Sequence, residues 1–149
     1  MDKISFKKQV INICISKEMQ YDSKNKKIIK EFNDVYLFIN LQKSNFCEGI
    51  NYLLFCKELH TYSEMLKLRI GDLSGRFIGI FNEKKTDLFD LDNANDNEII
   101  KAINNNIDLI VGILNTGGVK LYLENFPNSI VRAPIWAKKY LNNMMLQIN

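Results

Sequence analysis

The stretch Ile28–Gln42, which reads IIKEFNDVYLFINLQ, decides the fold of this chain. Ile28 to Phe32 and Val35 to Gln42 are rich in β-branched and aromatic residues, which favour strands. Only Asn33 and Asp34 separate the two runs, and both residue types tolerate the positive φ angles of a tight hairpin. The stretch therefore predicts two antiparallel strands joined by a two-residue turn.

The second of these strands predicts how the sheet is covered. Its residues alternate between an apolar set, Val35, Leu37, Ile39 and Leu41, and a set that is only partly apolar. One face is therefore expected to pack against helices. The run Ile50 to Leu59 has the same composition and predicts a third strand of a meander.

Helical periodicity appears on both sides of this meander. In the N-terminal run Ile4 to Met19 the apolar residues recur near every 3.6 positions, with Ile4, Ile11, Ile15 and Met19 along one side and Val10 and Cys14 beside them. Ile99 to Leu114 is more regular still.

The limits of the two C-terminal helices follow from cap residues. Asn95 with Glu98 resembles a capping box, and Gly117 with Gly118 is expected to end that helix. Pro134 suits the first turn of a last helix, whose Trp136, Tyr140 and Met144 form a stripe interpreted as core.

The middle of the chain predicts shorter elements. Tyr62 to Leu68 suits a short helix, and Arg69 to Leu73, Phe77 to Phe81 and Asp87 to Leu91 suit strands. Residues 119–126 fit either a strand or a helix. The whole pattern predicts one α+β domain over residues 1–149. We expect an antiparallel sheet of about 4 to 6 strands, with N-terminal and C-terminal helices packed mainly on one face.

Composition and length exclude several classes of protein. The 149 residues are 46% hydrophobic and 25% charged, as in soluble globular domains and unlike disordered or collagenous chains. Apolar runs such as Val35 to Leu41 are too short to span a bilayer, and the charged N-terminus does not resemble a signal peptide. We expect a cytoplasmic protein whose cysteines, Cys14, Cys47 and Cys56, are reduced.

The positive charge has a weak functional meaning. The net charge of +3 comes almost wholly from lysine, since only Arg69, Arg76 and Arg132 are arginines. A sequence pI of about 8.7 is below that typical of nucleic-acid-binding domains, so a nucleic-acid partner is not expected. Residues 1–30 nevertheless hold eight lysines against three acids. An exposed face is the favoured interpretation, and contact with RNA or an acidic protein is the other.

Three segments together carry a resemblance to a known family. They are Ile39 to Ser44, Ile50 to Leu59, and Arg69 to Leu73, between an N-terminal amphipathic helix and C-terminal helices. In this order the chain resembles the bacterial domain-of-unknown-function family 4304. That family has a tryptophan-rich strand after the Arg-Ile-Gly segment, whereas the only tryptophan here is Trp136. The resemblance implies no catalytic or binding residue, and it implies an association with toxin-immunity or defence loci.

No catalytic residue, metal ligand or cofactor site is expected. The only histidine, His60, has no evident partner that would orient it as a base. A zinc site of Cys47, Cys56 and His60 is disfavoured, because Cys56 and His60 would lie about 13 Å apart on an extended strand. Neither the P-loop pattern nor the dinucleotide-binding glycine pattern occurs, and the acidic residues between 87 and 96 lack the spacing of a calcium loop.

The most informative polar cluster is Gln42, Lys43 and Ser44 at a strand end, with Arg69 expected beside it. A structural hydrogen-bond network is the favoured interpretation, and a binding site is the alternative. We expect a non-enzymatic binding protein with another protein as its partner, a toxin being one candidate, in an immunity or defence role. The alternative is an enzyme or nucleic-acid-processing factor that uses Gln42, Lys43 and Arg69. A homodimeric structural protein is a third hypothesis.

Overall fold

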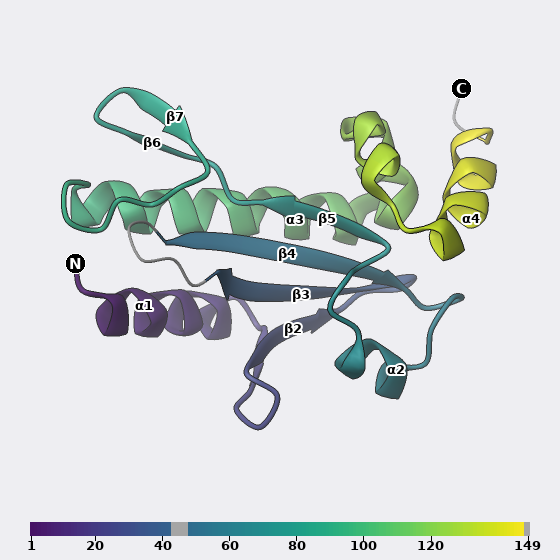
Figure 1. The fold of residues 1–149 in the computed structure, drawn as a ribbon, viewed down its shortest axis with the longest axis horizontal. Helices are drawn as coiled ribbons and strands as arrows, with labels where there is room; N and C mark the ends of the chain where they lie inside the picture. Colours follow the sequence, from purple (N-terminus) through teal and green to yellow (C-terminus); the bar gives the residue numbers. More distant parts are fainter. Residues whose placement is uncertain (43–47, 148–149) are drawn as a thin grey trace.

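The computed structural model describes residues 1–42 and 48–147, except for the side chain of Gln42. A sheet of five antiparallel strands, in the order β1-β2-β3-β4-β5, runs through the molecule, and β6 and β7 form a separate two-stranded sheet (Figure 1). The elements follow in this order: α1 (Lys3–Ser16), β1 (Gln20–Asp22), β2 (Lys27–Glu31), β3 (Val35–Gln42), β4 (Gly49–Cys56), α2 (Tyr62–Lys67), β5 (Leu73–Arg76), β6 (Gly79–Phe81), β7 (Lys84–Thr86), α3 (Asp96–Asn125), the 3₁₀ helix η1 (Pro127–Arg132) and α4 (Ile135–Met145).

The predicted meander is confirmed. β2 pairs with β3 and β3 with β4, and the Phe32 N–H donates to the Val35 carbonyl at 2.9 Å across the predicted turn. Neither Asn33 nor Asp34 has a positive φ, so that part of the turn prediction is wrong. Before the meander, Gln20–Asp22 forms β1, which pairs with β2.

The two faces of the five-stranded sheet are covered unequally. Val35, Leu37 and Ile39 contribute to a large core that α1, α3 and α4 complete. The opposite face carries a small core, formed mainly by Phe38, Phe55 and Met65 of α2. The predicted α+β class, with the N-terminal and C-terminal helices mainly on one face, is therefore confirmed.

Helix α1 is present, but its buried face differs from the prediction. Ile4 and Ile15 are exposed. The helix buries Val10 and Cys14, which were predicted beside the apolar side, together with Phe6 and Ile13. Apolar residues occur on more than one side of this helix, so periodicity alone does not fix its rotation. Packing decides it: the ring of Phe6 lies 5.7 Å from that of Phe89, a residue far along the chain.

Gly118 breaks the longest helix without ending it. The predicted stop is correct in that Gly118 has φ 62° and ψ −150°, outside the helical region. Helical backbone resumes at Val119, whose N–H donates to Asp34 Oδ2 at 3.2 Å, and continues to Asn125. Asp34 thus caps the second half of α3, and residues 119–125 are helical.

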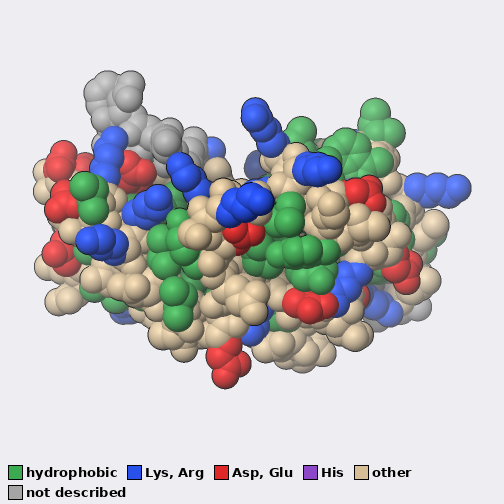
Figure 2. All heavy atoms as spheres, turned by 90° about the horizontal axis from the view of Figure 1, so that it is seen from below, with side chains coloured by type: hydrophobic (Ala, Val, Ile, Leu, Met, Phe, Trp, Pro, Cys, Tyr) green, Lys and Arg blue, Asp and Glu red, His purple; other side chains and the backbone are tan. Residues whose placement is uncertain are grey.

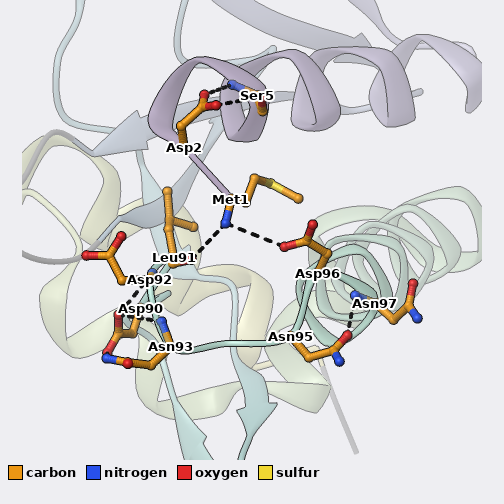
Figure 3. A network of polar contacts seen from close by, with 10 residues as sticks. All are labelled: Met1, Asp2, Ser5, Asp90, Leu91, Asp92, Asn93, Asn95, Asp96 and Asn97. Carbon is orange, nitrogen blue, oxygen red and sulfur yellow. Dashed lines mark hydrogen bonds and ion pairs between the residues drawn. The ribbon is translucent and has the colours of Figure 1, made fainter.

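Polar contacts fix the N-terminal ends of α1 and α3 (Figure 3). Asp2 accepts a hydrogen bond from the Ser5 N–H at 2.7 Å. Asn95 accepts from the Asn97 N–H at 2.8 Å, so it caps α3 as predicted. The predicted capping box is wrong in its second half, because Glu98 instead accepts from the Asn82 N–H.

The segment after β5 differs from the predicted strands. The strand expected at 77–81 is shortened to β6, which pairs with β7 at 84–86. Residues 87–91 form no strand, although Phe89 makes an isolated bridge to Glu48. β6 and β7 project from the rest of the molecule in Figure 1.

Helix α4 begins after Pro134, as predicted, but the stripe interpreted as core is at its edge. Ala137 and Leu141 are its buried residues, whereas Trp136 is 48% exposed. Among the described residues, no helix combines the length and apolarity needed to cross a membrane.

Candidate functional site

The structure separates Gln42 from Arg69, two members of the predicted polar cluster. Lys43 and Ser44 lie outside the described residues, and Gln42 pairs through its backbone with Gly49 at the start of β4. Arg69 lies between α2 and β5, and the Asp72 N–H nearby donates to Leu54, close to the end of β4. Gln42 and Arg69 therefore lie toward opposite ends of the sheet (Figure 1).

Arg69 itself differs from the prediction. It was expected on a strand, but the strand begins at Leu73, and Arg69 lies in an exposed bend. Within the described residues it makes no hydrogen bond or ion pair. The contact that would have made Arg69 structural is therefore missing, and its role as a binding residue stays a prediction.

His60 has the partner that sequence reasoning did not find. Its Nε2 lies 2.8 Å from Oδ1 of Asp72, which is fully buried. The same carboxylate accepts from Trp136 Nε1 at 2.9 Å and from the Cys56 N–H at 2.8 Å. Asp72 therefore ties the segment before α2, the end of β4 and helix α4 to one another. The expectation that His60 stands alone was wrong.

The geometry of this hydrogen-bond cluster around Asp72 is that of a structural contact and not of a catalytic dyad that activates a nucleophile. The side chain of His60 is only 8% exposed, and its ring is nearly perpendicular to that of Phe55, with the ring centroids 5.7 Å apart. The neighbouring Cys56 is buried, and burial together with the Asp72 charge raises the pKa of its thiol, so the thiol stays protonated near neutral pH. A protonated, buried thiol is a poor nucleophile.

A cleft lies between α1 and the sheet. Its volume is about 850 Å³. The apolar part of its lining comes from Phe6 and Ile11 of α1, Tyr21 of β1, and strand residues Ile28, Ile39 and Leu41. The polar part consists of Lys3, Lys7, Asn25, Lys26, Lys27, Asn40 and Glu48. The cleft thus combines an apolar floor with lysines from α1 and from the β1–β2 hairpin.

The lysines of this cleft are not equivalent. Lys3 lies 3.5 Å from the buried carboxylate of Glu48. Burial lowers the pKa of Lys27, whose Nζ lies 5.2 Å above the Phe38 ring, on the face covered by α2. Lys7 and Lys26 are exposed, and neither forms an ion pair within residues 1–42 and 48–147. These two are the charges most accessible to a ligand.

Figure 2 shows the side of the molecule seen from below the view of Figure 1. Several lysine or arginine side chains lie along this side, with hydrophobic side chains between them. The lysine excess in residues 1–30 is evident from the sequence, but the cleft is not. The missing information was the contact between α1 and the strands, because Lys7 and Lys26 are 19 positions apart and belong to different elements.

Neither a metal-ligand search of the described residues nor comparison with known proteins assigns a function to this chain. The described residues contain no group of three or more His, Cys, Asp or Glu side chains placed to hold a metal ion, and Cys47 lies outside them. No family model, curated protein or solved structure matches this chain. The resemblance to domain-of-unknown-function family 4304 therefore stays an expectation from the sequence.

Proposed function

We propose that this chain is a cytoplasmic binding protein that takes an acidic, partly apolar segment of another protein into the cleft between α1 and the sheet. The observation that carries this proposal is the composition of the cleft lining. Ile11, Tyr21 and Leu41 supply partly exposed apolar surface, and Lys7 and Lys26 supply accessible positive charge. Burial of apolar side chains provides affinity, and complementary charge favours the correct partner.

The lining favours a protein partner over a nucleic acid. A nucleic acid is usually held by several cations that follow its backbone, and arginine is the preferred residue. The cleft has no arginine in its lining, and its floor is aliphatic and aromatic. A peptide with carboxylates beside Leu, Ile or Phe side chains satisfies both parts of the surface.

An immunity or defence role is part of the proposal, but it rests on the family resemblance and not on the cleft. The partner would then be a toxin whose acidic segment enters the cleft. A toxin gene beside the gene for this chain, and rescue of growth when both are expressed, would support that role. An operon of metabolic enzymes would contradict it.

Binding of a defined peptide tests the proposal directly. The probe is a short fluorescent peptide of Glu with interspersed Leu, and its control has Gln for every Glu. We expect the acidic peptide to bind and the affinity to fall about tenfold in Lys7→Glu/Lys26→Glu, as measured by fluorescence anisotropy.

The matched control is Lys101→Glu/Lys138→Glu, which changes the net charge equally at exposed sites outside the cleft lining. This variant should retain nearly full affinity. The proposal is wrong if the acidic peptide does not bind, if the Gln peptide binds equally well, or if both double variants lose affinity to the same extent.

A further inference from the structure

A second, smaller cleft lies on the opposite face of the sheet, at the β5 edge. Its volume is about 390 Å³. Asn51 and Leu53 alternate with Tyr52, which points into the large core, so both face the other way. Their cross-strand partners Arg76 and Ser74 share this face. Leu53 also belongs to the small core on this face.

Arginine is concentrated at this cleft. The chain has 20 Lys and Arg residues, of which only Arg69, Arg76 and Arg132 are arginines. Arg76 of β5 and Arg132 of η1 both line the cleft, because η1 packs beside β5. Tertiary structure thus places two of the three guanidinium groups at one hollow. Guanidinium groups bind phosphate and carboxylate oxygens in a bidentate manner, which ammonium groups do not.

The two arginines differ in their surroundings. Arg76 Nη1 donates to Asp87 Oδ2 at 3.1 Å, and both side chains are partly exposed. Arg132 makes no ion pair within the part of the chain that the structure describes, and it is exposed. Arg132 therefore offers a positive charge that the protein itself does not neutralise, and Asp87 orients Arg76.

An unpartnered acceptor provides a second, independent observation at the same place. Asn51 Oδ1 is buried and accepts no hydrogen bond from the described residues. Buried polar atoms in native proteins are nearly always hydrogen-bonded. A ligand that carries an O–H or N–H donor would satisfy this oxygen, while Ser74 adds a hydroxyl to the lining.

We propose that this cleft binds a small oxyanion that also carries hydroxyl groups, such as a sugar phosphate or a sugar acid. The anion lies between Arg76 and Arg132, and a hydroxyl of the ligand donates to Asn51 Oδ1. The cleft is lined by different residues from the larger one, so this inference does not depend on the proposed protein partner.

Calorimetric titration tests the inference with four probes: ribose 5-phosphate, gluconate, inorganic phosphate and ribose. Ribose 5-phosphate, gluconate or both should bind more tightly than inorganic phosphate, and ribose should not bind. The tighter of the two identifies the source of the oxyanion. If neither binds, or if ribose binds as well as they do, the inference is wrong.

Variants locate the site. Arg132→Gln should weaken the binding of the preferred probe about tenfold, whereas Lys138→Gln, an exposed charge change on α4, should not. Asn51→Ala should reduce the preference for that probe over inorganic phosphate. Binding of the acidic peptide should be unchanged in Arg132→Gln. Equal losses in Arg132→Gln and Lys138→Gln would assign the binding to general charge and overturn the proposed site.

Discussion

Asp72 illustrates how much one residue can organise in this fold. It is fully buried, and its carboxylate accepts three hydrogen bonds, from a histidine, a tryptophan and a backbone N–H. Hydrogen bonds to a charged group contribute about 1.5 to 3 kcal/mol each, and they are not additive when they share an acceptor. A stabilising hydrogen-bond network was predicted around Arg69, but the structure has such a network around Asp72.

Asp72→Ala should lower the free energy of unfolding by about 3 kcal/mol or more, because it removes the shared acceptor and leaves buried donors unpaired. Arg69→Ala should change it by less than about 0.5 kcal/mol, since Arg69 is exposed and makes no hydrogen bond or ion pair with the described residues. Urea denaturation midpoints compare the two. Equal changes in the free energy of unfolding would show that the hydrogen bonds of Asp72 do not stabilise the fold.

Glu83 carries backbone strain in the β6–β7 turn. Its φ is 67° and that of Asn82 is 50°, a left-handed pair that favours glycine at the second position. Glu83→Gly should raise stability by about 1 kcal/mol. The control Glu58→Gly, at a residue without positive φ, should lower it by about 0.5 to 1 kcal/mol, because glycine gives the unfolded chain more freedom. A loss of stability in Glu83→Gly, measured by thermal denaturation, would contradict the argument.

At the scale of elements, the break in α3 shows why two glycines of one helix differ. Gly118 has φ 62° and ψ −150°, which is essentially a glycine-only region, and a Cβ there would lie 2.5 Å from Asp34 Oδ1. Gly112 lies in regular helix, and a Cβ there would have no heavy atom within 4 Å. The first glycine is required by the structure, and the second is not.

Gly118→Ala should therefore lower the free energy of unfolding by about 2 to 4 kcal/mol, through backbone strain and the contact with Asp34. Gly112→Ala should raise it by about 0.5 to 1 kcal/mol, because alanine has the higher helix propensity. Denaturant unfolding of both variants gives the comparison. Similar effects of the same sign would mean that α3 does not require a glycine at its break.

At the scale of the whole molecule, the core holds groups that resist ionisation. Burial raises the pKa of Cys14 to about 12, and it raises that of Cys56 as well. Burial also raises the pKa of Tyr52 and Tyr122, whose hydroxyls lie 2.8 Å apart. In the unfolded chain these thiols and phenols ionise at lower pH, so the native state holds more protons in alkaline solution.

Stability should consequently be constant near neutral pH and should fall as the pH rises above about 9, where free thiols ionise. Each pH unit between the unfolded and folded pKa values costs about 1.4 kcal/mol per group. The loss from Cys14 extends to about pH 12. Urea unfolding with reductant at rising pH measures the slope, and Cys14→Ala should make it shallower. An unchanged slope in Cys14→Ala would contradict burial of that thiol.

Local sequence was sufficient for the elements whose pattern is self-contained. The hairpin around Asn33 and Asp34, the meander and the first part of α3 follow from alternation, periodicity and turn residues that lie close together in the chain. These patterns predicted an α+β fold. They did not predict the rotation of α1, because its apolar residues occupy several sides and only packing against Phe89 selects the buried one.

The hydrogen bonds and clefts that the side chains form depend on the tertiary structure. Trp136 is far in sequence from His60 and Asp72 and meets Asp72 only because α4 packs where β4 ends. Likewise, Lys7 and Lys26 share a cleft, and Arg76 and Arg132 share another, through contacts between separate elements. Neighbours in sequence constrain backbone conformation, whereas hydrogen bonds, buried charge and clefts depend on distances that only the folded chain sets. The sequence alone determined the class of fold, and the packing of its elements determined the candidate sites.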